Sequence, residues 1–406
     1  MINRKKVLVL SARLPYPLDS GGRIRAYHVL RTLAGHFQAT LLALSGNETA
    51  SGYSDEIEKL GVRVVTIGNP RIDRPAGVAD AVRNLTSPLP LTVAKYTCSL
   101  MEKAVEGFMA DGFDVIHCEQ LHMAVYAAGR FPGVPKVLDA HNVESQIAER
   151  YARQEGNIMK KAFLSNNYRK MLRFEKRAAS SFDLILAVSS NDRENLASYG
   201  GGERVKLLEN GVDLEYFHPQ HQSGGKHLVF VGSMDWLPNV DGMLYFLGDI
   251  YPLIQAVLPD VKLSIVGKNP PETLVRASAA LPSVRITGTV DDVRPYVADA
   301  AVFIVPLRFG GGTRLKILEA FAMGRPVVST SLGCEGIEGQ NGKHLIIADT
   351  PQQFSDAVIR LLSNEGLRNE LSSNARRLAE EIYSWDVIGS KLLGYYDSLL
   401  AGKNIS

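Results

Sequence analysis

The sequence has little cysteine, almost no net charge and no long apolar run. Its 406 residues include three cysteines, Cys98, Cys118 and Cys334, which are too few and too scattered for a disulfide framework or a zinc cage. A reducing compartment fits this cysteine usage, so we expect a cytoplasmic protein. Lysine and arginine number 45 against 43 acidic residues, a net charge of +2, which gives no reason to expect a nucleic-acid partner.

The apolar runs are much shorter than the roughly 18–20 residues needed to span a bilayer. Near the N-terminus a short apolar run leads into a charged loop, so we interpret it as a buried strand and not as a signal peptide. The loop after it, residues 19–23, reads Asp-Ser-Gly-Gly-Arg and lacks the G-x-G-x-x-G spacing of dinucleotide-binding enzymes. No P-loop, nucleophile elbow or H-E-x-x-H zinc motif occurs, and we expect no metal site.

Short apolar segments alternate with longer helical patterns, which is the signature of parallel sheets built from βαβ units. The predicted strands are residues 7–10, 39–44, 62–67, 114–117, 136–140 and 183–188, and then 227–231, 261–266, 284–287, 302–305 and 327–330. Between the two sets lies a polar, glycine-containing linker, and the chain from residue 351 onward looks wholly helical. We therefore predict an α/β protein with two doubly wound parallel-sheet domains, residues 1–218 and 219–380, facing a cleft.

The strongest motif, residues 302–330, reads strand, glycine loop, helix, tight turn and strand. The loop glycines Gly310, Gly311 and Gly312 let backbone N–H groups approach an anion, and the helix N-terminus adds partial positive charge. This combination suits a diphosphate. Near the N-terminus, residues 20–22 (Ser-Gly-Gly) also follow a strand and open a helix, where the backbone either faces a ligand or forms only a tight turn.

The helix after the glycine loop is apolar nearly all round and should be buried, yet it carries charged residues. Lys316 and Glu319 share one face of this helix with Gly312. One interpretation is a ligand-binding pair behind the phosphate loop; the other is an i, i+3 ion pair at a partly exposed edge. Arg314 lies off that face but can reach phosphates from the first turn.

The sequence in these segments resembles glycosyltransferase family 4, the group 1 glycosyl transferases of the GT-B superfamily, and is most similar to bacterial exopolysaccharide-type sugar transferases. The resemblance is dense in RFGGGTRLKILEAFAMGRPVVST at residues 308–330 and at 231–234, 265–268 and 286–290. It implies the GT-B fold, with two Rossmann-like domains and C-terminal residues 381–406 packing back on the first. It also implies retaining transfer of a sugar from a UDP- or GDP-sugar, with no required metal or other cofactor.

The resemblance assigns roles in the second domain. Glu319 matches the second glutamate of an E-x7-E pattern that binds the donor ribose, while glycine replaces the first glutamate at position 311. Residues 233–239 lack the basic residues that relatives place there, so Arg314 and Lys316 would supply the charge that faces the diphosphate. The donor-binding residues implied across the chain are Gly21, Gly22, Gly232, Gly267, Lys268, Val290, Gly310, Gly311, Gly312, Thr313 and Glu319.

In the first domain, His141 follows a buried strand and matches a histidine that contacts the transferred sugar in relatives; a strand-end cap is the alternative. With Arg314 and Lys316 it completes the expected catalytic set. Glu119 also ends a strand, and the acceptor-side candidates are Glu119, Asn142 and Glu144. Residues 150–177 are basic with interspersed aromatics, which suits either an anionic membrane or lipid-linked acceptor, or only a solvated helix surface.

We therefore predict a glycosyltransferase that moves a sugar to a hydroxyl group of a glycan, lipid-linked or small-molecule acceptor. It would act in the cytoplasm or peripherally at the inner face of the membrane, in polysaccharide or glycoconjugate biosynthesis. Two alternatives remain open. One is a sugar-nucleotide 2-epimerase of the same fold, and the other is a catalytically silent partner subunit that only binds the nucleotide sugar.

Overall fold

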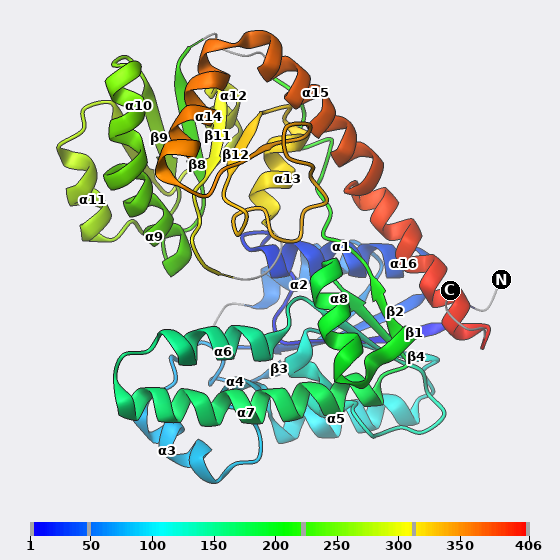
Figure 1. Cartoon of the computed structure of the whole chain (residues 1–406). Helices are drawn as coiled ribbons and strands as arrows, with labels where there is room; N and C mark the ends of the chain where they lie inside the picture. Colours follow the sequence, from blue (N-terminus) through cyan, green and yellow to red (C-terminus); the bar gives the residue numbers. More distant parts are fainter. Residues whose placement is uncertain (1–3, 47–49, 221–224, 311–313, 403–406) are drawn as a thin grey trace. The chain divides into compact units, whose positions relative to one another are not determined.

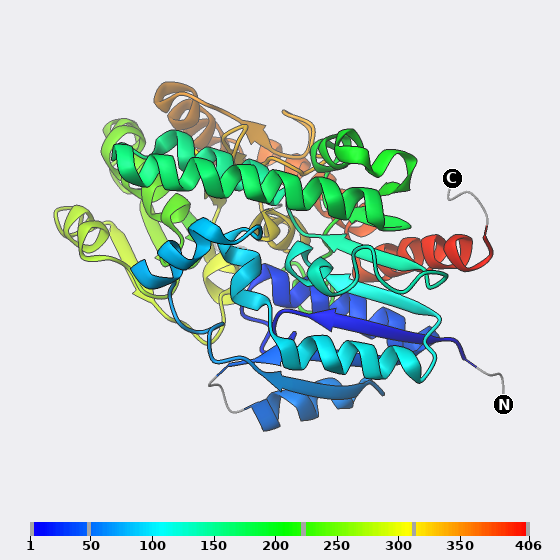
Figure 2. The ribbon, with the colours of Figure 1, turned by 90° about the horizontal axis from the view of Figure 1, so that it is seen from below.

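The structure is a computed structural model that describes residues 4–46, 50–220, 225–310 and 314–402. The chain divides into two compact units, which Figures 1 and 2 show from two directions: unit 1 is residues 1–209 with 389–406, and unit 2 is residues 210–388. The first division falls before the predicted boundary at 218/219. The N–H of Val212 donates to the carbonyl of Tyr383 (2.7 Å), which ties the start of the linker to unit 2.

Unit 1 contains a parallel sheet with the strand order β3-β2-β1-β4-β5-β6-β7. Its strands are β1 (Lys6–Ser11), β2 (Gln38–Ser45), β3 (Arg63–Gly68), β4 (Val115–Glu119), β5 (Lys136–Ala140), β6 (Leu184–Ala187) and β7 (Val205–Leu207). Its helices are α1 (Gly21–His36), α2 (Ala50–Glu58), α3 (Val78–Thr86), α4 (Leu91–Tyr96), α5 (Ser99–Ala110), α6 (Glu144–Gln154), α7 (Ile158–Ser181) and α8 (Ser190–Leu196). The central strands are buried on both faces, as continuous apolar runs require.

Unit 2 repeats this architecture with the order β10-β9-β8-β11-β12-β13. Its strands are β8 (His227–Val231), β9 (Lys262–Val266), β10 (Val284–Gly288), β11 (Val302–Val305), β12 (Val327–Ser329) and β13 (Ile346–Ile347). Its helices are α9 (Leu237–Tyr245), α10 (Tyr251–Val257), α11 (Glu272–Ala279), α12 (Arg294–Asp299), α13 (Leu315–Ala322), α14 (Pro351–Ser363) and α15 (Glu365–Ile382). The predicted pair of doubly wound parallel sheets is confirmed, and the short edge strands β7 and β13 are additions to the prediction.

The last helix, α16 (Trp385–Leu400), begins in unit 2, and its residues from Gly389 onward belong to unit 1. There the phenol of Tyr396 lies 2.7 Å from Nδ1 of His117 on β4, and its ring contacts Phe37. The hydroxyl of Tyr395 donates to the carbonyl of Leu207 on β7 (3.1 Å). The C-terminal segment therefore packs on the sheet of unit 1. Among the described helices, none combines the length and apolar character that crossing a bilayer demands.

Both sheets reverse their winding direction at one point, between β1 and β4 in unit 1 and between β8 and β11 in unit 2. Loops diverge at such a reversal, so the carboxyl ends of these strands leave room for a ligand. Gly21 and Gly22 open the helix after β1, and Glu119 ends β4. Gly232 follows β8, and Gly310 lies in the loop after β11. The topology therefore places predicted donor-binding residues at both reversals, and the acceptor-side candidate Glu119 at the reversal in unit 1.

Candidate active site

In unit 2 two glycines bring backbone and side chains into close approach. A Cβ on Gly267 would lie 1.9 Å from the carbonyl oxygen of Gly232. A Cβ on Gly232 would lie 2.5 Å from Nζ of Lys316 and 2.7 Å from Nδ2 of Asn239. Neither glycine can carry a side chain without displacing its neighbours. The loop after β9 therefore lies against the loop after β8, and the loop after β8 lies close to Lys316.

Lys316 lies in the first turn of α13, a helix whose other side is buried as predicted. Its ammonium donates to Oδ1 of Asn239 (2.9 Å) and lies 4.1 Å from the ring centre of Phe230. Burial, reinforced by the charge of Arg314, lowers the pKa of Lys316 to about 7, although Glu319 acts in the opposite sense. The lysine is held in place by an amide and not by the i, i+3 ion pair that was the alternative interpretation.

Glu319 lies three residues further along α13 and is half-buried. Burial raises the pKa of its carboxyl to about 7, with Lys316 opposing this shift. Within the described parts of the chain, its carboxylate makes no hydrogen bond or ion pair. A half-buried carboxylate with its acceptor sites unused can receive hydrogen bonds from a pair of ligand hydroxyls.

Arg314 precedes α13, is 3 % exposed, and stacks with its guanidinium carbon 5.1 Å from the ring centre of Trp236. Gly310 has φ +121, and a Cβ there would lie 3.0 Å from both Nη2 of Arg314 and the Trp236 ring. The stretch after β8 has no basic residue, yet it supplies Trp236 and Asn239. These two side chains contact Arg314, just before α13, and Lys316, in its first turn. The predicted donor residues Gly311, Gly312 and Thr313 lie outside the described residues.

The remaining donor candidates of unit 2 lie on neighbouring loops. The carbonyl of Lys268, an exposed residue after β9, accepts the N–H of Met234 (2.9 Å), so this loop is tied to the one after β8. Val290 follows β10 and is half-buried. A cavity of about 560 Å³, which neither of these two residues lines, is formed by residues from Pro270 to Gly288.

In unit 1 a buried ion pair joins the end of β5 to α1. Nε of Arg25 lies 3.0 and 2.9 Å from the two carboxylate oxygens of Asp139 at the end of β5, and Nη2 lies 2.7 Å from one of them. Nη1 also donates to the carbonyl of Glu209 (2.9 Å). Burial acts to raise the pKa of Asp139, but Arg25 and His141 hold it well below its usual range. Asp139 is therefore a permanent anion beside the histidine.

His141 follows β5, and its Nε2 lies 3.0 Å from Oε2 of Glu119 and 3.6 Å from Oδ2 of Asp139. Burial acts to lower the pKa of His141, but both carboxylates outweigh it and raise the pKa to about 9. At neutral pH the side chain is an imidazolium. On its other side, Nδ1 lies 3.6 Å from the Cβ that a side chain at Gly22 would have. The structure thus brings the glycine turn after β1 and the predicted histidine together.

Glu119 is buried, and each of its carboxylate oxygens contacts one imidazole. Oε1 lies 3.0 Å from Nε2 of His117, and Oε2 contacts His141. Burial and Asp139 act to raise the pKa of Glu119, but the two histidines hold it below its usual value. Such a carboxylate is better placed to orient His141 than to meet an acceptor.

The other two acceptor-side candidates lie at the start of α6. Nδ2 of Asn142 contacts Oε1 of Glu144 at 3.4 Å. The buried carboxylate of Glu175 on α7 accepts the N–H groups of Glu144 (2.8 Å) and Ser145 (3.1 Å). Glu175 satisfies two of the unpaired donors at this helix N-terminus. The start of α6 is therefore fixed by α7.

Residues that sequence reasoning missed complete the cluster in unit 1. Gln120 has φ +71, an unfavourable backbone for this residue, and its side chain lies 3.3 Å from the Cβ position of Gly22. Ligand atoms of His117, Glu119 and Asp139 lie within 4.8 Å of one another, a grouping that could hold a metal ion. In this structure these three side chains contact Tyr396, His141 and Arg25. No sequence spacing signals these partners, since they come from distant parts of the chain.

Comparison with known proteins shows the family of this chain. The family described as Glycosyltransferase Family 4 matches residues 21–216, and the family described as Glycosyl transferases group 1 matches residues 225–364. The chain folds as a GT-B glycosyltransferase and is a transferase by class. It belongs to the family 4, group 1 glycosyltransferases, as the sequence resemblance implied.

A relative from Klebsiella pneumoniae, named as an uncharacterized 44.6 kDa protein in the cps region, is 26% identical over 395 residues, covering 93% of this chain and 96% of the relative. Sucrose-phosphate synthase from Thermosynechococcus elongatus has a TM-score of 0.72 at 16% identity, covering 98% of this chain and 100% of that chain. Anabaena HepE, solved with UDP-glucose, has a TM-score of 0.66 at 16% identity, covering 97% and 99%. These two structures share the fold of this chain.

Proposed function

We propose that this protein transfers a sugar, with retention of anomeric configuration and without a metal, from a nucleoside diphosphate sugar to a hydroxyl acceptor. The observation that carries the proposal is the group Arg314, Lys316 and Glu319, which follows β11 at the reversal of the sheet of unit 2. Two cations there are held by Trp236 and Asn239, and a carboxylate without a partner in the described chain lies beside them. The two cations suit the diphosphate of a nucleotide sugar, and the carboxylate suits the hydroxyls of the ribose attached to it.

Each side chain has a role in that reaction. The anomeric carbon–oxygen bond to the diphosphate breaks, a bond to the acceptor oxygen forms on the same face, and the departing phosphate takes the acceptor's proton. Charge grows on the diphosphate as its bond breaks, so Arg314 and Lys316 stabilise the transition state more than the ground state. A bound diphosphate would also raise the pKa of Lys316 from about 7 and keep its ammonium charged.

The donor base and sugar are proposed from the neighbours and the loops. HepE was solved with UDP-glucose, which favours a UDP-sugar over a GDP-sugar. Gly232 and Gly267 let the loops after β8 and β9 lie close together. Lys268 and Val290, on neighbouring loops, would flank the base. On unit 1, we propose that the imidazolium of His141 touches the transferred sugar and that Gly21 and Gly22 face the ligand. Asn142 and Glu144 would line the acceptor side.

The 2-epimerase alternative needs carboxylates that can exchange protons near the sugar. Glu119 and Asp139 are the buried carboxylates of the unit 1 cluster, and both are engaged in ion pairs that hold their pKa values low. This arrangement favours transfer over epimerisation. A silent partner subunit has no use for an imidazolium held beside the strand end, so the His141 network favours a catalyst.

Membrane contact is a further part of the proposal. Ile158 and Met159, at the start of α7, are 84 % and 83 % exposed and precede the exposed Lys160 and Lys161. Exposed apolar side chains beside lysines suit the surface of an anionic bilayer. We propose that this part of residues 150–177 holds a cytoplasmic enzyme peripherally at the inner face of the membrane, where it serves polysaccharide or glycoconjugate biosynthesis.

The experiment is a thermal-shift panel of UDP- and GDP-sugars, followed by product detection on lipid-linked and small soluble hydroxyl acceptors, with and without excess EDTA. We expect one donor to raise the melting temperature and to give a product with the donor's anomeric configuration in EDTA. Nucleotide release with a 2-epimer and no acceptor would establish the epimerase. Activity lost in EDTA and restored by magnesium or manganese would contradict the metal-free mechanism.

A further inference from the structure

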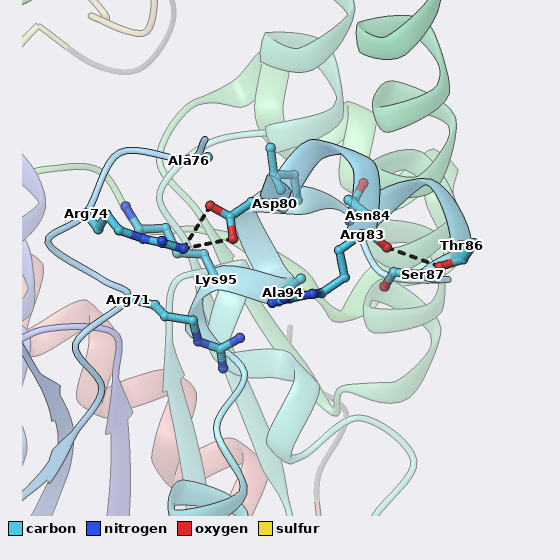
Figure 3. A pocket seen from close by; sticks show the side chains of 11 residues that line it. Arg71, Arg74, Ala76, Asp80, Arg83, Asn84, Thr86, Ser87, Ala94 and Lys95 are labelled. Atoms are coloured by element: carbon cyan, nitrogen blue, oxygen red, sulfur yellow. Dashed lines mark hydrogen bonds and ion pairs between the residues drawn. The ribbon is translucent and has the colours of Figure 1, made fainter. Parts of the chain in front are cut away.

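Unit 1 contains a second cavity, of about 300 Å³, on the segment that follows β3 (Figure 3). The loop after β3, the helix α3 and the helix α4 form its walls. Four of its lining residues are basic, Arg71, Arg74, Arg83 and Lys95, and one is acidic, Asp80. The formal charge of the lining is therefore strongly positive, in a protein whose total charge is only +2.

The single carboxylate neutralises only one of these cations. Both oxygens of Asp80 lie 2.9 Å from Nη2 of Arg74, and Figure 3 shows the pair at one side of the cavity. Arg71 donates to the backbone carbonyl of Thr97, which carries no full charge. Within the described residues, neither Arg83 nor Lys95 donates a side-chain hydrogen bond or joins an ion pair. Three cations of the lining therefore form no direct ion pair within the described parts of the chain. Asp80 attracts Arg83 and Lys95 only at longer range, and the lining keeps an excess of positive charge.

These cations also repel one another. Lys95 is half-buried, and burial together with the charges of Arg13 and Arg74 lowers its pKa, although Asp73 acts against this shift. An anion in the cavity would remove the repulsion. A single carboxylate would leave two of the three charges unpaired, whereas a phosphate monoester or diphosphate carries two or more charges and offers oxygens on several sides for arginine.

The segment that forms the cavity contacts loops at the carboxyl edge of the same sheet. The ring of Tyr96, the residue after Lys95, lies 4.9 Å from the ring of His122, which follows β4. Arg13, which follows β1, donates to the carbonyl of Ile72 (2.8 Å) in the loop that leads to the cavity. The segment is thus anchored at the carboxyl ends of β1 and β4, the strands that flank the reversal point. A ligand held there is on the acceptor side of the proposed reaction.

We propose that this cavity binds a phosphate or diphosphate group of the acceptor substrate, with Arg83 and Lys95 as its principal contacts. Ala76, Leu91 and Ala94 form an apolar part of the wall, against which the rest of the acceptor can pack. The acceptor is therefore a phosphorylated molecule. That the ligand is the acceptor rests on the proposed transferase function. Binding of an anion to the cavity can be measured without turnover.

The first experiment is calorimetric titration with inorganic pyrophosphate at low salt. It is done in a Lys316→Gln background, so that the donor-side lysine does not contribute. Arg83→Gln with Lys95→Gln should weaken binding about a hundredfold, roughly tenfold for each cation removed. Lys103→Gln, which removes an exposed cation on α5 outside the cavity, is the matched control and should change nothing. Arg83 is exposed and its side chain makes no hydrogen bond within the described residues, so a stable variant is expected.

Absence of pyrophosphate binding in the Lys316→Gln background, or equal binding by the double variant and the control, would overturn the proposal. A second pair of probes identifies the source of the phosphate. Tighter binding of dodecyl phosphate in neutral detergent micelles than of glucose 1-phosphate assigns a lipid-linked acceptor, and equal binding assigns a soluble one. For either assignment, Arg83→Gln with Lys95→Gln must also abolish the binding of that phosphate compound.

Turnover separates this proposal from the proposed function. If the protein is a transferase and the cavity holds the acceptor phosphate, the double variant should raise the acceptor KM at least tenfold, while the donor KM stays unchanged. Transfer with an unchanged acceptor KM would remove the cavity from the reaction and leave the transferase intact. Pyrophosphate binding without any transfer would contradict the function and leave the anion site established.

Discussion

The charge on His141 is the feature of unit 1 that a single substitution tests most directly. Its pKa of about 9, against an ordinary value of 6.5, depends on Glu119 at 3.0 Å and Asp139 at 3.6 Å. Glu119→Gln keeps the size of the side chain and removes one of the two anions. We expect the pKa of His141 to fall by more than one unit, because a hydrogen-bonded anion is lost while burial still opposes the charge.

The same shift has a consequence for stability. A histidine whose pKa is raised in the folded state stabilises that state fully below its unfolded pKa, near 6.5, and loses this contribution as the pH rises through 9. The shift of about 2.5 units corresponds to about 3 kcal/mol. The loss of unfolding free energy caused by His141→Asn should therefore be about 3 kcal/mol greater at pH 6 than at pH 9.5.

The assay is an NMR titration of the His141 ring, paired with chemical denaturation of wild type and His141→Asn at both pH values. Glu58→Gln, which neutralises an exposed glutamate of the same unit, is the control and should leave the titration unchanged. A wild-type pKa at or below 6.5 would refute the reasoning. So would a pKa that Glu119→Gln does not move.

Three further predictions concern catalysis and the donor side. Glu319→Ala should lose two charge-assisted hydrogen bonds to the ribose, about 2–4 kcal/mol, and raise the donor Kd steeply while the fold survives; wild-type affinity for the nucleoside diphosphate would exclude the role. Donor affinity should peak near pH 7, because Lys316 loses its charge above its pKa and Glu319 loses its charge below. Calorimetry against pH should lose the alkaline limb in Lys316→Met and the acidic limb in Glu319→Gln, and a flat profile would contradict both shifts. His141→Ala should bind the nucleoside diphosphate normally yet turn over at least about a hundredfold more slowly, a cost of about 2.7 kcal/mol, and weakened binding with unchanged kcat would move His141 to the donor pocket.

Local pattern alone determined the architecture of this protein. Buried parallel strands are continuous apolar runs, so β5, β8 and β11 lie at the residues that their apolar runs predicted. The edge strands β7 and β13 escaped prediction because strands of three and two residues show no periodicity. The apolar helix after the glycine loop and the glycine turn that opens α1 were also evident, since a glycine or a capping residue marks a backbone requirement within a few positions.

Only the tertiary structure decided how the charged residues are paired. The sequence left Lys316 and Glu319 as either a ligand pair or an ion pair, and the fold pairs Lys316 with Asn239, 77 residues away in the chain. It likewise brings Arg25 to Asp139 across 114 residues, and Tyr396 to His117 across 279. The pKa of a side chain depends on burial and on charges within a few ångströms, and both are properties of the packed sheet and not of the local sequence. For the same reason the basic cavity formed by the loop after β3, α3 and α4 is visible only once these elements are packed together.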